Sequence, residues 1–484
     1  MGNALVILHV DGLGADSLEE ALSSGLMPFT KHLVAAEGYQ IHRYRCGIPS
    51  TTPFAQAGIL YGDNSEIPSF RWWDRERQVL VQFGARSTFK KVADKYFAGC
   101  RPLTQDGACI AACYPAGAAD DFGIAYQDRV YSRSGTSRSA LRVVLPYFAN
   151  PLHLADWLWH ALVSIWRTAV QYVSARVGGR RPAATYVLND AAEEIFVHHL
   201  TRYAVEKAMH EGYSPIYAGF YAFDETGHAF GPDHRHSLAI LKQVDHTIRK
   251  VAEARRDRYE LVVLSDDGQI DTVPFFIDAG VRLGALVADW MPGFRVREMK
   301  GKEFGPDASE AKGLVIITSS GGLGHLYMAD RGRRLAFGDI SNRHPELVGN
   351  LGAQERIALV MGRGRTEDVF IAAGIEYRGA AVKEILARYD DADILYDQLL
   401  RLNSFEQSGD LVFFGSFKAD KQINFEDQAG GHGAFGGEQT HPFVLAKRDW
   451  AMDTSHVHGA HELHPILSEL RDRLKRAPVS YSRS

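Results

Sequence analysis

The chain has 484 residues, of which 45% are hydrophobic and 23% are charged, and its formal net charge is −5. This is an ordinary globular composition with ample material for a core, and the length suggests one large α/β domain with insertions or two to three domains. A net negative charge gives no sign of the basic surface that nucleic-acid-binding proteins have. Four scattered cysteines are too few for a disulfide framework.

The first predicted element is a buried strand at Ala4–Val10, an apolar run that ends at Asp11. The run lacks the basic flank and the cleavage site of a signal peptide. No stretch reaches the roughly 18 uncharged apolar residues of a membrane span. The nearest, Leu152–Val173, contains an aspartate, a histidine and an arginine. We therefore expect a cytoplasmic protein in a reducing setting, with membrane association as an open alternative.

The next element is a short helix predicted over Phe54–Tyr61, preceded by the loop segment Pro49–Pro53. Thr is favoured at the N-cap and Pro at the first helical position, which predicts Thr52 as the cap. A hydroxyl there faces unpaired backbone N–H groups and the positive end of the helix dipole, which stabilise an alkoxide and a nearby phosphate. A lone Thr-Pro pair is more often only a structural cap, so a chemical role for Thr52 depends on the residues around it.

Two later apolar runs also end in acidic residues: Pro215–Phe223 precedes Asp224, and Leu261–Leu264 precedes Asp266 and Asp267. Continuous apolar runs of this length fit strands that are buried on both faces of a parallel sheet. In open α/β sheets, ligands bind outside the carboxyl ends of the strands. The acidic residues at these strand ends therefore predict a site.

Helical patterns alternate with the strands, at Leu241–Val251 and at Val382–Tyr389, and a further strand is predicted at Leu411–Phe414. This alternation predicts a doubly wound α/β fold with a mostly parallel central sheet between helix layers. About 170 residues separate Thr52 from Asp224, too many for a simple connection in a compact domain. We predict a catalytic core of residues 1–65, 205–285 and 400–484, with a helical, Trp-rich insertion at 66–204 and a second insertion at 286–399, both capping the site.

The stretch Leu152–Val173 is predicted as a helix with an apolar stripe that three tryptophans widen: Trp157, Trp159 and Trp166. A helix packed into the insertion is the more common interpretation of such a pattern. The alternative is an interfacial segment that lies on a membrane or grips a lipid tail.

Chemistry-bearing residues gather at the predicted strand ends. Asp224 and His228 place a carboxylate and an imidazole four residues apart, and His432 lies in a Gly-rich loop whose backbone can approach a ligand closely. The segment Ser265–Gly268 supplies two adjacent carboxylates, which are costly together unless a cation offsets them, although a solvated turn is the ordinary alternative. Together these weak signals predict a two-metal site with Thr52 as nucleophile.

Five segments occur in a fixed order: DG at 11–12, PSTTPFAQAGILYG at 49–62, DETGH at 224–228, SDDGQ at 265–269 and GGHG at 430–433. As a set they resemble the alkaline phosphatase superfamily, and most closely its type I phosphodiesterase/nucleotide pyrophosphatase branch. That branch has a Thr nucleophile before a helix, an Asp-x-x-x-His pair, a Ser-Asp-His-Gly turn and a late His. The strand-like HPFVLA at 441–446 and a helix at Leu463–Leu474 resemble the last elements of the branch.

The resemblance implies two divalent metal ions, one bound by Asp224, His228 and His432 and the other by Asp11, Thr52, Asp266 and Asp267. Two departures from the branch matter.

First, Asp267 stands where the branch has His. The resulting all-oxygen set suits Mn²⁺ or Mg²⁺, with Zn²⁺ still open, whereas the Asp224/His228/His432 set is typical of Zn²⁺. Second, the branch has an Asn that holds a phosphoryl oxygen some way after the nucleophile. Here Arg71 or Asn64 would bind substrate instead.

The implied function is hydrolysis of a small phosphodiester or nucleotide-like pyrophosphate through a phosphothreonine intermediate at Thr52. A phosphomonoesterase or phosphotransferase of the same superfamily is the nearest alternative. A lipid-headgroup hydrolase, with peripheral membrane contact through residues 152–173, and a catalytically degenerate binding protein, with Asp267 as its lesion, are further alternatives. A sulfatase is disfavoured, because no Cys or Ser-x-Pro-x-Arg signature lies near position 52.

Overall fold

The computed structural model describes residues 3–83, 86–124, 138–177, 197–255, 258–299 and 311–476. A six-stranded sheet lies at its centre. Its strand order is β2-β19-β7-β1-β6-β5, and only β19 runs antiparallel to its neighbours. The predicted mostly parallel sheet is therefore confirmed. The strands are β1 (Ala4–Val10), β2 (Tyr39–Arg43), β5 (Ala108–Ile110), β6 (Ile216–Phe220), β7 (Tyr259–Leu264) and β19 (Phe443–Lys447).

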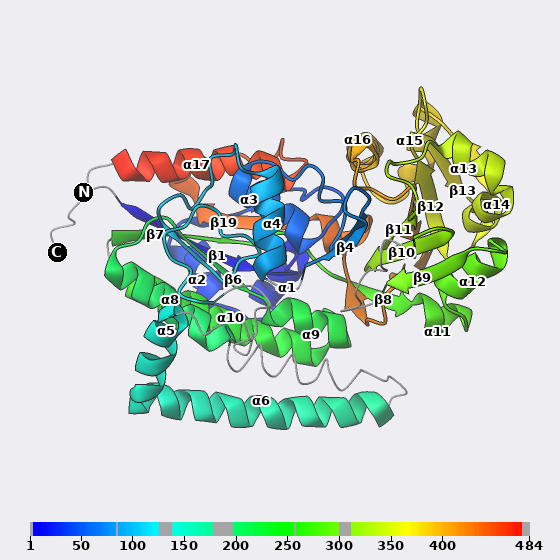
Figure 1. The fold of residues 1–484 in the computed structure, drawn as a ribbon. Helices are drawn as coiled ribbons and strands as arrows, with labels where there is room; N and C mark the ends of the chain where they lie inside the picture. Colours follow the sequence, from blue (N-terminus) through cyan, green and yellow to red (C-terminus); the bar gives the residue numbers. More distant parts are fainter. Residues whose placement is uncertain are drawn as a thin grey trace.

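Helices cover both faces of this sheet, as the prediction of helix layers requires (Figure 1). On one face α17 packs against α3 and β1, and on the other α10 packs against α8, α9 and α2. Apolar side chains on both faces of β1, such as Val6 and Ile7, are fully buried between the layers. The helices are α1 (Ala15–Ser23), α2 (Pro28–Ala36), α3 (Thr52–Tyr61), α4 (Arg86–Tyr96), α8 (His198–Glu211), α9 (Ala222–Phe230), α10 (Arg235–Ala254) and α17 (Ala460–Arg476).

A second, seven-stranded sheet lies beside the core, at the right of Figure 1, in the order β14-β13-β12-β15-β11-β10-β9. The predicted strand Leu411–Phe414 is its β15 (Leu411–Gly415), so it pairs here and not with the core strands. The other members are β9 (Arg295–Met299), β10 (Leu314–Ser320), β11 (Leu323–Met328), β12 (Ile357–Gly362), β13 (Val369–Ala372) and β14 (Ile375–Tyr377), with helices α11 (Phe275–Ala279), α12 (Leu283–Trp290), α13 (Phe337–Arg343), α14 (Pro345–Ala353), α15 (Ala380–Leu386) and α16 (Ala392–Ser404).

Two smaller sheets complete the structure. One has the order β16-β17-β8-β18, and its strands β8 and β18 adjoin the segments that contain Asp267 and His432. The division into a core and two capping insertions stays a prediction. The strands are β8 (Ile270–Pro274), β16 (Phe417–Lys418), β17 (Lys421–Asn424) and β18 (Gly430–Gly431), and the second small sheet pairs β3 (Arg71–Asp74) with β4 (Val79–Gln82).

Two predicted element boundaries are wrong. Thr52 is the first residue of α3, not its cap: Thr51 is the N-cap, with φ −132° and ψ 141°, and its side chain makes no capping hydrogen bond. The run Pro215–Phe223 is not one strand, because β6 ends at Phe220 and α9 begins at Ala222. Asp224 therefore lies in the first turn of a helix. An apolar run alone does not distinguish a buried strand from the start of a buried helix.

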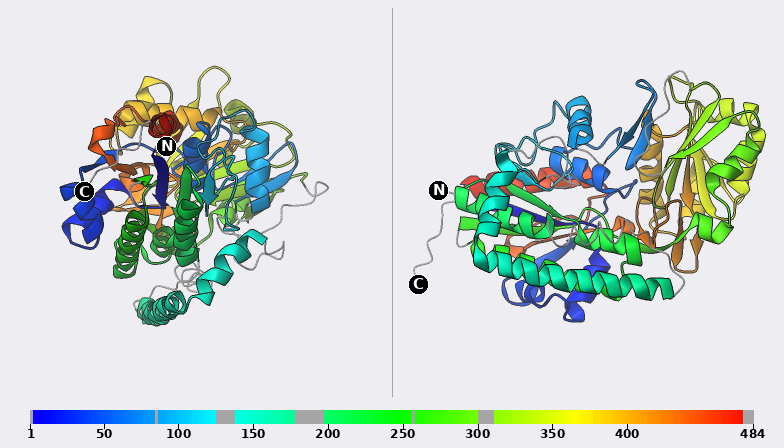
Figure 2. Two further views of the ribbon diagram at one scale, coloured as in Figure 1. Left: turned by 90° about the vertical axis from the view of Figure 1, so that its left-hand side faces the viewer. Right: turned by 60° about the horizontal axis from the view of Figure 1, so that its bottom comes forward.

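The predicted Trp-rich helix exists as α6 (Pro151–Val177), which follows α5 (Arg138–Ala149); it lies along the bottom of the molecule in Figure 1 and comes forward in the right-hand view of Figure 2. Much of its apolar stripe is exposed, with Trp159 67% and Trp166 69% exposed, whereas Trp157 is partly buried and packs against the core. The helix is therefore only partly packed into the molecule. Among the side chains of α6 that the structure describes, the fully buried ones are small, at Ala161, Ser164 and Thr168. None of the helices within the described residues is both long and apolar enough to cross a membrane.

Candidate active site

The site forms where three adjacent parallel strands end. Strand β1 pairs with β6 on one side and with β7 on the other, so their carboxyl ends meet at one edge of the sheet. Asp11 follows β1 directly, and its N–H donates to Phe220 O at the end of β6 (3.0 Å). The structure brings all seven predicted metal ligands to this edge, and all but the partly buried His228 are buried: Asp11, Thr52, Asp224, His228, Asp266, Asp267 and His432.

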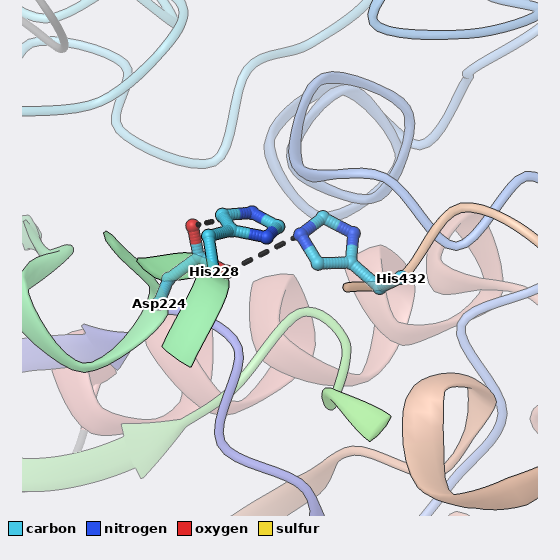
Figure 3. A group of neighbouring side chains, drawn as sticks. All are labelled: Asp224, His228 and His432. Carbon is cyan, nitrogen blue, oxygen red and sulfur yellow. Dashed lines mark ion pairs between the residues drawn. The ribbon is translucent and has the colours of Figure 1, made fainter. Parts of the chain in front are cut away.

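The first ligand set consists of Asp224, His228 and His432 (Figure 3). Asp224 Oδ2 lies 3.3 Å from His228 Nε2, and Asp224 Oδ1 lies 3.2 Å from His432 Nε2. Two ligands about 2.0–2.1 Å from a tetrahedral Zn²⁺ lie about 3.3 Å apart, so these separations fit one ion. The mixed nitrogen and oxygen donors also fit Zn²⁺.

The first ligand set balances its own charge. Burial alone would raise the pKa of Asp224, but His228 and His432 hold it below its usual value. Burial would lower the pKa of His228, and Asp224 instead raises it to about 9. A carboxylate beside a cationic imidazole therefore stands in this set when no ion is bound, and an ion has to displace the imidazole proton.

Neighbouring groups fix the Asp224 carboxylate. Gln269 Nε2 donates to Asp224 O (2.9 Å) and also to the carboxylate oxygen Oδ1. Gly12 has φ +70°, and a Cβ on it would lie 2.7 Å from Asp224 Oδ1, so a larger residue would collide with the ligand. The glycine after Asp11 thus permits the close approach of the two ligand sets.

The second ligand set is predicted as Asp11, Asp266 and Asp267, with Thr52 beside them. In the structure, Asp11 and Asp266 form a group that could hold an ion together with His9, and Asp267 as a ligand stays a prediction. The Thr52 hydroxyl donates to Asp11 Oδ1 over 3.4 Å. Within the described part of the chain, Asp11 Oδ2, Asp266 Oδ2 and both Asp267 carboxylate oxygens are buried and accept no hydrogen bond. Orphaned buried oxygens of this kind fit a hard divalent cation such as Mn²⁺ or Mg²⁺.

The charges of the second set are not balanced by the protein. Burial, and then the charge of Asp266, raise the pKa values of Asp11 and Asp267 well above the usual range. Burial would also raise the pKa of Asp266, but His9 lowers it. A divalent cation would offset this cluster of buried carboxylates.

The two proposed substrate-binding residues lie in different surroundings. Arg71, at the start of β3, is buried and donates from Nη1 to Glu426 Oε1 (2.8 Å). Burial would raise the pKa of Glu426, but Arg71 and, more weakly, His228 lower it, so this pair lies within electrostatic reach of the first set. Asn64 follows the carboxyl end of α3, and its Oδ1 accepts from Arg401 Nη2 (2.6 Å). Substrate contact by Arg71 or Asn64 stays a prediction.

Sequence reasoning missed three polar residues that support the site. His9 Nε2 lies 2.7 Å from Asp266 Oδ1 and 3.7 Å from Asp11 Oδ1. Gln56 contacts His9, and Gln269 holds Asp224. A usable signal existed for His9, because residues two apart on a strand face the same side and Asp11 is two residues further on. Gln269 lies in a quoted motif, but nothing in the sequence gave it a role.

The comparison with family models decides the class of the protein. The model described as type I phosphodiesterase / nucleotide pyrophosphatase matches residues 5–293. The chain belongs to this family. The predicted membership of the alkaline phosphatase superfamily and the predicted class, a metal-dependent phosphoric ester hydrolase, are thereby confirmed. Hydrolysis of phosphodiester or pyrophosphate bonds is the activity of the family, and a small phosphoester is its kind of substrate.

Solved structures confirm the fold. Two structures of phosphonoacetate hydrolase from Sinorhizobium meliloti 1021, in complex with phosphonoformate and with phosphonoacetate, match with TM-scores of 0.50 and 0.52. Each match has 14% sequence identity and covers 97% of this chain and 96% of the other. At this identity the likeness concerns the α/β fold alone. No curated protein matches the sequence.

Proposed function

We propose that this family member cleaves a phosphodiester or pyrophosphate bond with two divalent ions and with Thr52 as the nucleophile. The observation that carries the proposal is the position of the Thr52 hydroxyl. It lies at the first residue of α3, 3.4 Å from Asp11 Oδ1, with two separate ligand sets at the same sheet edge. Asp224, His228 and His432 would hold Zn²⁺, and Asp11, Thr52, Asp266 and Asp267 would hold Zn²⁺, Mn²⁺ or Mg²⁺.

The ions, when bound, would supply Lewis acidity that lowers the Thr52 hydroxyl pKa and stabilises the leaving oxygen. The chain itself supplies orientation: Asp11 holds the hydroxyl, and the free N–H groups in the first turn of α3 face the phosphoryl oxygens. A bond forms between Thr52 Oγ1 and phosphorus as the ester O–P bond breaks and the alcohol or phosphate product leaves. Water then hydrolyses the phosphothreonine and restores the hydroxyl.

The test compares bis-p-nitrophenyl phosphate with p-nitrophenyl phosphate, after addition of Zn²⁺ or Mn²⁺, for the wild type, Thr52→Ser and Thr52→Ala. We expect diester turnover that falls by about six orders of magnitude in Thr52→Ala, the scale on which removal of a nucleophile acts. Thr52→Ser keeps a hydroxyl and retains much more activity. Mass spectrometry of acid-quenched enzyme should find a phosphoryl group on residue 52 of the wild type.

Other outcomes select the alternatives. Preference for the monoester would favour a phosphomonoesterase or phosphotransferase. Undiminished turnover in Thr52→Ala would contradict the nucleophile. Absence of bound metal together with absence of turnover would favour a degenerate binding protein. Phosphonoacetate belongs in the substrate panel because one of the two structures that share the fold is a complex with it.

We also propose that α6 contacts a lipid surface. Its exposed side chains include five large apolar ones that would pack into the headgroup boundary: Leu152, Trp159, Leu162, Ile165 and Trp166. Tryptophan is the side chain that prefers this boundary, because its ring is apolar while its N–H reaches water. The test is co-sedimentation with anionic phospholipid vesicles, which should be lost in Trp159→Ser/Trp166→Ser. Failure of the wild type to bind vesicles, or self-association through α6, would contradict this contact.

A further inference from the structure

His9 is a fully buried polar side chain inside the central strand β1, and none of the motifs includes it. Its Nε2 lies 2.7 Å from Asp266 Oδ1, beside the second ligand set. This set has Asp267 at the position where its family has a histidine. His9 could therefore replace the missing imidazole as a ligand, or it could act on the carboxylates as a hydrogen-bond donor. The contacts on the far side of the ring distinguish these roles.

Gln56 determines which nitrogen of His9 carries the proton. The backbone N–H of Cys113 donates to Gln56 Oε1 (2.9 Å), and a backbone N–H has no other role, so the orientation of the amide is fixed. Gln56 Nε2 then donates to His9 Nδ1 (3.2 Å) and to Tyr221 Oη (2.9 Å). Because Nδ1 accepts, the neutral imidazole carries its hydrogen on Nε2, the nitrogen that lies 2.7 Å from Asp266 Oδ1.

The two histidines of the first ligand set have the opposite arrangement. His228 Nδ1 lies 3.1 Å from Gly430 O, and His432 Nδ1 lies 2.7 Å from Ser50 O. A carbonyl oxygen only accepts, so each Nδ1 donates and Nε2 is the nitrogen that offers a lone pair once an ion has displaced its proton. Both Nε2 atoms face Asp224, the arrangement that metal-binding histidines generally show.

The distances separate the roles in the same way. In the first set, each imidazole nitrogen lies 3.2–3.3 Å from its nearest carboxylate oxygen, the spacing of two ligands on one tetrahedral ion. The 2.7 Å between His9 Nε2 and Asp266 Oδ1 is shorter than the spacing of two ligands on one tetrahedral ion and matches a close charge-assisted pair. His9 thus lies against the Asp266 oxygen that accepts from the Asp267 N–H, while Asp266 Oδ2 accepts no hydrogen bond within the described residues.

We infer that His9 is a positioning residue that donates to Asp266, and that the second ion is bound by oxygen atoms alone. His9 therefore does not take the place of the imidazole ligand that is absent at position 267. The two ion positions then differ in their ligand atoms: one has nitrogen and oxygen ligands, which suit Zn²⁺, and the other has only oxygen ligands, which suit Mn²⁺ or Mg²⁺. This inference rests on the two-ion function proposed above.

The test compares His9→Gln with His9→Ala. The amide of glutamine places a donor near the position of Nε2, whereas alanine removes it. We expect His9→Gln to keep the Mn²⁺ affinity of the wild type within a few-fold, and His9→Ala to weaken it by about 10–100-fold, the scale on which loss of a group that orients a metal ligand acts. Metal content and equilibrium dialysis measure both, and thermal unfolding shows whether each variant is folded.

Pulsed electron paramagnetic resonance of Mn²⁺ reports directly on bonded nitrogen. We expect the nitrogen couplings of wild type and His9→Gln to be the same. A directly bonded nitrogen that is present in the wild type and absent from His9→Gln would make His9 a ligand and overturn the inference. Unchanged Mn²⁺ affinity in His9→Ala would also overturn it, since no positioning role would remain. Failure of the wild type to bind two ions would instead overturn the proposed function, so the two failures are distinguishable.

Discussion

The two ligand sets at the sheet edge differ in whether neighbouring side chains stabilise their buried charges. In the first set, Asp224 lies beside His228 and His432, and the carboxylate and the imidazole stabilise each other's charged forms. In the second set, Asp11 and Asp267 face further carboxylates, and their pKa values are raised. The first set is therefore stable in itself, whereas the second set depends on a cation. This difference predicts opposite responses to the same kind of substitution.

The largest expected contrast is between Asp224→Asn and Asp267→Asn in protein freed of metal by chelation. Asp224→Asn removes the partner of a buried imidazole and should lower the free energy of unfolding by about 1–3 kcal/mol. Asp267→Asn removes a charge that other carboxylates repel, and should raise it by about 1–2 kcal/mol at neutral pH. Chemical denaturation in the presence of a chelator measures both.

With saturating Mn²⁺ or Zn²⁺, Asp267→Asn should lower the free energy of unfolding instead of raising it, because the wild type then gains binding energy that the variant lacks. Equal destabilisation by the two substitutions in chelated protein would contradict the contrast between the sets.

The pH dependence of metal-free stability should follow the same contrast. The raised folded-state pKa values of Asp11 and Asp267 mean that their protonated forms stabilise the fold, and this contribution is lost as the pH rises above about 4 through those values. His228, with its pKa raised to about 9, contributes stability that is complete below about 6.5 and is lost as the pH rises through 9. Asp224, with a lowered pKa, contributes stability above about 4 that is lost in acid.

Metal-free protein should therefore lose thermal stability as the pH rises from 5 to 9, and bound ions should remove this slope because they displace the same protons. The measurement is thermal unfolding against pH with chelator and with Mn²⁺. In Asp267→Asn the slope without metal should be shallower than in the wild type. A metal-free stability that rises over this range would contradict the assigned pKa directions.

The sequence predicted the first strand and Asp11 to the residue, because an apolar run that ends in Asp-Gly has one simple structural interpretation. It predicted β15 as a strand but not its sheet, since a strand's pattern shows its burial and not its partner. His9 was missed because a histidine within an apolar strand resembles a core residue, although its position two residues before Asp11 places both on one side of the strand. The stripe on α6 was found, but periodicity does not show whether such a face meets the protein or solvent.

The smallest expected effect comes from restoring the family's histidine with Asp267→His. The side chain at 267 lies close to the first set, since Asp267 Oδ2 is 3.2 Å from His432 Nδ1. An imidazole there would add a nitrogen donor to the all-oxygen set and remove one of its buried charges, so the preference of the second position should shift from Mn²⁺ toward Zn²⁺. We expect about a tenfold change in the ratio of the two affinities, measured by competitive dialysis.

Because His9 already donates to Asp266, the shift should also occur in His9→Gln/Asp267→His. If the ratio changes only when His9 is intact, the two imidazoles act on the same ion and the contrast between the sets fails. If it does not change at all, the residue at 267 is not a ligand.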